Sequence, residues 1–207
     1  IKYLNKYHKI LDQNIIKSQK FIPKILAAKT VPELMGYEGS LSVIYWDCIK
    51  TILNAPFDGR ITYQARDIVN SSLNYAYAIL YTKIRYYLII AGLSLHISFL
   101  HALDERKPTL SFDMIEEFRT FIVDRVIVSM INKNEPMTLN KDGFLNDKTK
   151  KLIAQNINEK LGSYITYKKQ VVKIESIIEK QCYALSNFVN EKSNSYKSFI
   201  GKWEVRR

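Results

Sequence analysis

Apolar side chains recur along most of this chain every three or four residues, the spacing that places them on one face of an α-helix. The first such run covers residues 1–28 and is interrupted near Pro23, and a second covers residues 34–53. Thr30 followed by Pro32 is typical of a helix start, because a hydroxyl can cap the helix and proline is tolerated in its first turn. The first quarter of the chain is therefore expected to be helical.

The middle of the chain is predicted to contain a loop and one long helix. Residues 54–59 favour a turn, and the loop that they open continues to about Arg66. Asp67 is placed to cap the following helix, whose apolar pattern extends to Ile90 and stops at Gly92.

The second half continues the helical pattern. We expect a helix from about Ser111 to Asn132, a loop with a short hairpin near residues 137–145, and helices over residues 147–161 and 169–191. With only 7 glycines and 5 prolines, long helices are favoured over many short strands. The predicted fold class is all-α, a single multi-helix domain.

The charge of the chain bears on what kind of partner it binds. Lysine and arginine outnumber aspartate and glutamate by 31 to 20, a formal net charge of +11. This favours a polyanionic partner, with nucleic acid first and an anionic membrane surface second, although a basic protein without such a partner explains the charge alone equally well. Cys48 and Cys182 form no CxxC pair, which favours buried free thiols in a reducing compartment. We expect a cytoplasmic protein, because neither a signal peptide nor a membrane-spanning run is recognised.

Four residues form a candidate site: Glu38, His101, Asp113 and Glu116. Asp113 and Glu116 are three residues apart on a predicted helix, so their carboxylates can address one cation. Such carboxylates repel each other unless an ion or an arginine neutralises them, and Arg119 could do so or hold a phosphate. By themselves, the acidic pair is more often an ordinary first turn that faces water, and His101 a core histidine.

Taken together, these carboxylates and one imidazole suit Mg²⁺ or Mn²⁺ better than zinc. Glu38 lies between Gly36 and Gly39, which would let a ligand or another backbone approach closely. On a basic protein, such an ion fits phosphodiester chemistry, because it neutralises the scissile phosphate and activates a hydroxyl.

Several segments resemble the CRISPR-associated adaptation endonuclease-integrase family, called "Cas one". They are ELMGYEG at 33–39, DIVNSSLNYAYAIL at 67–80, GLSLHISFLH at 92–101 and SFDMIEEFRTFIVDR at 111–125. Residues 143–145 and 196–203 are similar to closing segments of the family. The motifs occur in the family's order, from about Ile15 to Trp203.

This resemblance implies that residues 1–207 are the helical catalytic domain of the family, without its usual β-rich N-terminal domain. A lead-in helix would cover residues 1–30, the metal-site core residues 31–132, and the C-terminal helices residues 133–207. A homodimer is implied, together with a small ferredoxin-like partner, "Cas two".

The resemblance also assigns roles to residues. Glu38, His101 and Asp113 match metal ligands for Mg²⁺ or Mn²⁺, and Glu116 completes the catalytic set. His96 is a second imidazole nearby, although its position favours His101 as the ligand. Tyr75 and Tyr77 are interpreted as core residues, and the expected DNA contacts are Arg60, Arg66, Asn70 and Arg119.

The implied activity is insertion of spacer DNA into a prokaryotic CRISPR array, in adaptive immunity against phages and plasmids. A 3′-hydroxyl of a double-stranded prespacer would attack a phosphodiester at the repeat, and water in its place would give endonuclease activity. Two alternatives remain open: a transposon-borne integrase with the same domain, and a helical DNA-binding module without catalysis.

Overall fold

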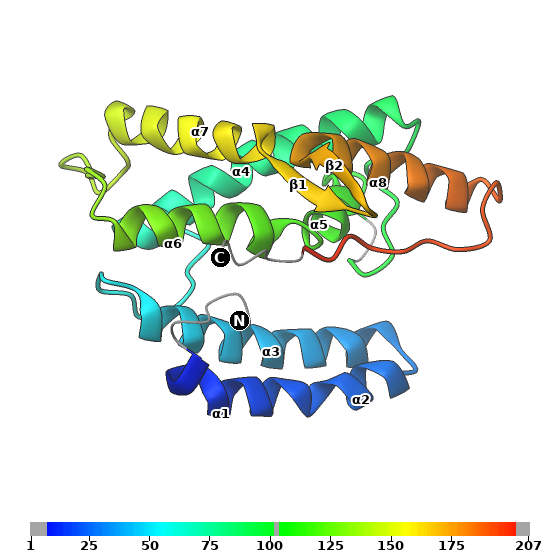
Figure 1. The fold of residues 1–207 in the computed structure, drawn as a ribbon, viewed down its shortest axis with the longest axis horizontal. Coiled ribbons are helices and arrows are strands. Elements are labelled where there is room, and N and C mark those ends of the chain that lie inside the picture. The colour runs from blue at the N-terminus through cyan, green and yellow to red at the C-terminus, as the bar shows by residue number, and fades with distance from the viewer. Residues whose placement is uncertain (1–7, 102–103, 202–207) are drawn as a thin grey trace. The chain divides into compact units, whose positions relative to one another are not determined.

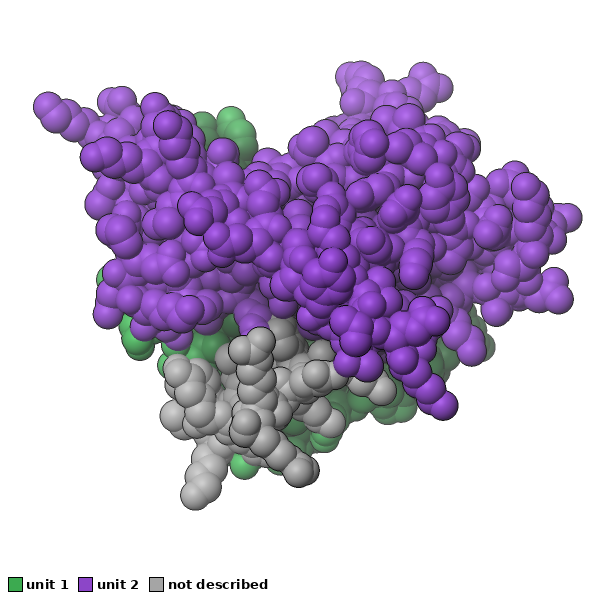
Figure 2. Space-filling model, turned by 45° about the horizontal axis from the view of Figure 1, so that its top comes forward, with its two compact units in different colours: residues 1–64, 203–207 green, residues 65–202 purple. Residues whose placement is uncertain are grey.

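A computed structural model describes residues 8–101 and 104–201, which are mostly helical (Figure 1). The predicted all-α class is confirmed. Within the described residues, the strands form one short hairpin. The chain divides into two compact units, residues 1–64 with 203–207 and residues 65–202, coloured separately in Figure 2. Their boundary falls inside the predicted metal-site core of residues 31–132, and Trp203 lies outside the described residues. No helix in the described ranges is long and apolar enough to cross a membrane.

The first unit contains α1 (His8–Gln19), α2 (Phe21–Ala27) and α3 (Val31–Ile52), and both shorter helices contact α3. Thr30 caps α3 as predicted, because its hydroxyl oxygen accepts the backbone N–H of Glu33 at 3.3 Å. The break predicted near Pro23 occurs at Lys20 instead. Pro23 lies in the first turn of α2, where its missing N–H costs no hydrogen bond.

The second unit is organised around α4 (Ile68–Ile90). This helix contacts α5 (Thr109–Ile115), the π-helical turn Thr120–Asp124, α6 (Arg125–Asn132), α7 (Asp147–Gly162) and α8 (Ile174–Val189). Asp67 caps α4 as predicted, because its Oδ1 accepts the backbone N–H of Asn70 at 2.8 Å. The buried apolar side chains of α4 follow the spacing of three and four residues that the sequence showed: Val69, Leu73, Ala76, Tyr77, Leu80, Ile84 and Leu88.

The continuous helix predicted over residues 111–132 is wrong. The chain forms α5, a tighter turn, the π-helical turn and then α6. In the tighter turn, the backbone N–H groups of Glu116 and Phe118 donate to carbonyls three residues back, at 3.3 and 2.9 Å. Apolar residues keep a nearly helical period through all these pieces, so their pattern does not distinguish them from one regular helix.

The helix predicted from residue 169 begins only at Ile174, because residues 164–173 form a hairpin. Strands β1 (Tyr164–Tyr167) and β2 (Gln170–Lys173) are antiparallel, and Tyr167 pairs with Gln170. Lys168 and Lys169 both have positive φ, 50° and 66°, as a two-residue turn of the primed type requires. The pairing predicted near residues 137–145 is reduced to one bridge between Leu139 and Leu145.

Glu175, in the first turn of α8, joins three elements of the second unit. Its carboxylate binds the Nζ of Lys83 on α4 at 2.8 Å and the Nζ of Lys173 on β2 at 2.9 Å. The hydrogen bond from Lys83 is the main cause that lowers the pKa of Glu175 to about 2. A carboxylate with a lowered pKa in the folded state stabilises the fold above its unfolded pKa, and this contribution is lost as the pH falls.

We therefore expect Glu175→Gln to reduce the free energy of unfolding by about 1 kcal/mol at neutral pH. The difference from wild type should shrink as the pH falls from 4.5 towards about 2. Urea unfolding of both proteins across this range measures it, with Glu179→Gln on the same helix as the control. An unchanged difference at the acidic end would contradict this assignment.

Candidate functional site

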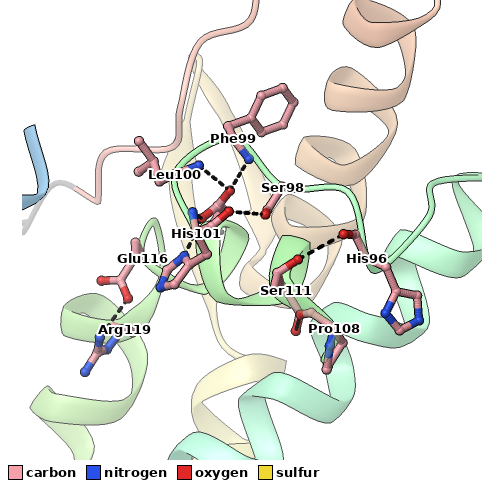
Figure 3. Close-up of polar contacts among 11 residues, drawn as sticks. His96, Ser98, Phe99, Leu100, His101, Pro108, Ser111, Glu116 and Arg119 are labelled. Carbon is pink, nitrogen blue, oxygen red and sulfur yellow. Dashed lines mark hydrogen bonds and ion pairs between the residues drawn. The ribbon is translucent and has the colours of Figure 1, made fainter. Parts of the chain in front are cut away.

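The carboxylate of Asp113, on α5, accepts hydrogen bonds from four donors of one short loop, whose residues Phe99, Leu100 and His101 are labelled in Figure 3. Its Oδ2 accepts the backbone N–H of Phe99 at 2.6 Å and of Leu100 at 3.0 Å. Its Oδ1 accepts the backbone N–H of His101 at 3.3 Å and lies 2.6 Å from the Nδ1 of the same residue. One side chain therefore fixes both the loop backbone and the orientation of the imidazole.

The imidazole of His101 is held through one ring nitrogen, Nδ1, which is hydrogen-bonded to Asp113. With an ionised carboxylate as its partner, Nδ1 is the donor, and in the neutral tautomer of this ring Nε2 carries the lone pair. The ring packs edge-on against Phe112, with the centroids 5.6 Å apart, and the Ser98 hydroxyl donates to the His101 carbonyl at 2.6 Å. The imidazole is 36% exposed, whereas the Asp113 side chain is 10% exposed. Nε2 can therefore bind a cation or accept a proton.

Glu116 and Arg119 form a second pair, one turn after Asp113. The Nη1 of Arg119 donates to the Oε1 of Glu116 at 2.7 Å, and the guanidinium lies over the ring of Tyr77 at 4.7 Å. Glu116 is the more open of the two carboxylates near the imidazole, since its side chain is 39% exposed. The predicted neutralisation of an acidic residue by Arg119 is thus present, and it falls on Glu116.

Glu117 has a role that sequence reasoning did not assign. Its Oε2 accepts the Nε2 of Gln181 at 2.9 Å and the backbone N–H of Phe199 at 2.8 Å, and its Oε1 accepts the hydroxyl of Tyr196. Burial and this hydrogen bond both raise the pKa of the Tyr196 phenol. Glu117 therefore fastens the C-terminal segment beside α5. Only a contact map could have revealed it, because these partners lie at least 64 residues away in sequence.

An apolar pocket of about 210 Å³ adjoins this arrangement in the second unit. Phe99 and Leu100 from the loop, Asp113 and Glu117 from the α5 region, and Tyr196 are among the residues that line it. The Asp113 carboxylate thus lies between the apolar lining of this pocket and the half-buried imidazole.

Glu38, the third predicted metal ligand, is exposed on α3 in the first unit. A Cβ added at Gly36 or Gly39 would meet no atom within 4 Å, so packing of the described residues does not require glycine at either position. Across the described ranges, no group of three or more His, Cys, Asp or Glu side chains is arranged to hold a metal ion. Of the predicted ligands, His101 and Asp113 lie together in the second unit, and Glu38 belongs to the first.

The predicted DNA contacts differ in what they already bind. Arg66 lies over the ring of Phe144 at 3.9 Å, and Arg60 lies over the ring of Trp46 at 5.9 Å. Asn70 is 1% exposed, and its side-chain amide donates to Asp67 at 2.9 Å, which completes the cap of α4. Arg119 therefore has the clearest position beside the candidate site.

His96, the second imidazole, has a partner in the loop before α5. Its Nδ1 lies 2.9 Å from the carbonyl oxygen of Lys107, and the Thr109 hydroxyl donates to the His96 carbonyl at 3.2 Å. These contacts fix the start of α5, and the carboxylate of Asp113 binds His101 instead. The preference for His101 over His96 as the metal ligand stays a prediction.

The family model described as "CRISPR associated protein Cas1" matches residues 1–159. The chain belongs to the Cas1 family. It is 33% identical over 208 residues to the "CRISPR-associated endonuclease Cas1 1" of Francisella tularensis subsp. novicida, covering 98% of this chain and 63% of that protein. The chain thus spans somewhat less than two thirds of the length of this Cas1 relative.

Solved structures share the fold of this Cas1 chain. A "Casposase bound to integration product" is 23% identical with a TM-score of 0.82, covering 91% of this chain and 56% of that one. The "Cas6-RT-Cas1--Cas2 complex" is 22% identical with a TM-score of 0.80, covering 93% of this chain and 22% of that one. The chain therefore shares its fold with these solved structures.

Proposed function

We propose that this chain is the catalytic domain of a metal-dependent DNA endonuclease-integrase that inserts spacer DNA into a CRISPR array. The observation that carries the proposal is the pair of Asp113 and His101. Three backbone N–H groups hold a carboxylate that in turn fixes an imidazole, and the second ring nitrogen is left for a cation or a proton. Membership of the Cas1 family and the net charge of +11 both support DNA as the substrate.

Glu38, His101 and Asp113 are the proposed ligands of Mg²⁺ or Mn²⁺, with Glu116 as the fourth catalytic residue. The donor set fits such an ion, because carboxylate oxygens dominate it and His101 offers only Nε2. In the geometry described, Asp113 holds Nδ1 and therefore lies across the ring from an ion on Nε2, so it orients His101. It would bind the same ion only after its hydrogen bond to Nδ1 breaks and the ring turns. Glu116, which is more exposed, has more room to meet a ligand. When bound, the ion would supply charge neutralisation at the scissile phosphate and activate the attacking hydroxyl.

The substrates are proposed to be a double-stranded prespacer and the repeat. A 3′-hydroxyl of the prespacer replaces one ester oxygen at the scissile phosphate, so no covalent enzyme intermediate is required. Arg119 is the proposed phosphate contact at the site, with Arg60 and Arg66 as more distant contacts. The similarity in fold to a Cas1–Cas2 complex supports the further proposal that this protein assembles with a Cas two partner. The homodimer is proposed from the family resemblance alone.

Incubation with a duplex that carries a free 3′-hydroxyl and a repeat-containing target tests this function. We expect joined products with Mn²⁺, no products with EDTA, and DNA binding that weakens steeply as salt rises. Salt-dependent binding without metal-dependent products would contradict the proposal and favour the non-catalytic module. The transposon-borne alternative predicts equal joining to a target that lacks the repeat.

A further inference from the structure

Tyr77, interpreted from sequence as a core residue, contacts the candidate site through Arg119. The tyrosine belongs to α4 and is 5% exposed, whereas the Arg119 side chain is 26% exposed. The guanidinium of Arg119 lies 4.7 Å from the centroid of the Tyr77 ring, within the range of a cation–π contact. On its other side, the same guanidinium donates to Glu116 at 2.7 Å.

The plane of the Tyr77 ring is fixed by a second contact. Its hydroxyl donates to the Oδ1 of Asp124, which is 1% exposed and lies in the π-helical turn that begins directly after Arg119. π-Helical turns shift the register of a helix by one residue and are frequent at functional sites. Asp124, in this turn, therefore binds the Tyr77 hydroxyl, while Arg119, directly before the turn, lies over the ring.

We propose that Tyr77 is a positioning residue that holds the Arg119 guanidinium beside Glu116, ready for a DNA phosphate. This inference rests on the proposed function of the site. An arginine side chain has many rotamers, and an aromatic platform with one fixed orientation reduces the number that it samples before DNA arrives. Phenylalanine would keep the ring but lose the bond to Asp124, so the structure calls for tyrosine at this position.

A double-mutant cycle on DNA binding tests the proposal. Arg119→Gln should reduce the slope of log K against log salt by about one, because one phosphate contact is lost. Tyr77→Leu should reduce this slope similarly and weaken binding about tenfold, but should have little further effect in the Arg119→Gln background. The DNA affinity and the salt slope of Tyr77→Phe should lie between those of wild type and of Tyr77→Leu.

The control is Ile84→Val, a core change on the same helix that should leave the slope unchanged, and thermal unfolding confirms that each variant is folded. The proposal would be overturned if Tyr77→Leu weakened DNA binding equally in the wild-type and Arg119→Gln backgrounds. It would also be overturned if Tyr77→Leu, made in the wild-type protein, left the slope of log K against log salt unchanged. Because the readout is metal-free DNA binding, its failure is distinguishable from failure of the proposed catalysis, which Mn²⁺-dependent product formation reports.

Discussion

Replacing His101 with alanine is expected to lower Mn²⁺-dependent strand transfer and cleavage by about 10³-fold. The substitution removes the one nitrogen that the site offers to a cation or a proton, since Nδ1 is engaged by Asp113 at 2.6 Å. The loss corresponds to about 4 kcal/mol of transition-state stabilisation. Single-turnover rates at saturating DNA measure it, because they separate the chemical step from binding.

His96→Ala is the matched control for this prediction. His96 is also an exposed imidazole of the same loop region, but its Nδ1 faces the carbonyl of Lys107 rather than a carboxylate. We expect its rate to stay within a few-fold of wild type. A large loss in His96→Ala with a small loss in His101→Ala would reverse the assignment of the two histidines.

Asp113→Asn is expected to lower the same rate by about 10- to 100-fold, through misorientation of His101 and weaker cation binding. An amide has one acceptor oxygen, and its NH₂ group would face N–H donors that the carboxylate now accepts. The variant should therefore also loosen residues 99–101, which faster amide hydrogen exchange at these positions would report.

Glu116→Gln distinguishes the role of the Glu116 carboxylate from that of Asp113. This change leaves the Asp113 contacts in place, so exchange at residues 99–101 should match wild type while cation affinity falls. If Asp113→Asn leaves loop exchange and rate unchanged, the orienting role of Asp113 is wrong.

The sequence predicts most of this fold because its helices have strong local signals. The capping side chains of Thr30 and Asp67 and the apolar periodicity of α4 depend on neighbours within one or two turns. The π-helical turn after Arg119 and the hairpin at Lys168–Lys169 depend on tertiary packing and on backbone angles that side-chain periodicity does not encode. The two largest errors in the predicted helices fall at these places.

In the candidate site, too, local spacing was predictable from the sequence and tertiary contacts were not. Asp113 and Glu116 were predicted to share one face of a helix, and the pairing of Asp113 with His101 follows from loop closure over twelve residues. Spacing could not reveal that the Asp113 carboxylate binds the loop backbone or that Arg119 pairs with Glu116. Residues such as Tyr77 and Glu117 act through partners distant in sequence, so their roles need coordinates. The participation of Glu38 stays a prediction.

A crystal structure with Mn²⁺, located by anomalous scattering, tests the central claim most directly. We predict one ion at about 2.0–2.3 Å from the Nε2 of His101, with carboxylate oxygens of Glu38 and Glu116 in its coordination sphere, or of Glu38 and Asp113 if the bond between Nδ1 and Asp113 has broken. An ion bound elsewhere, or no ion at His101 at Mn²⁺ concentrations that support product formation, would contradict it.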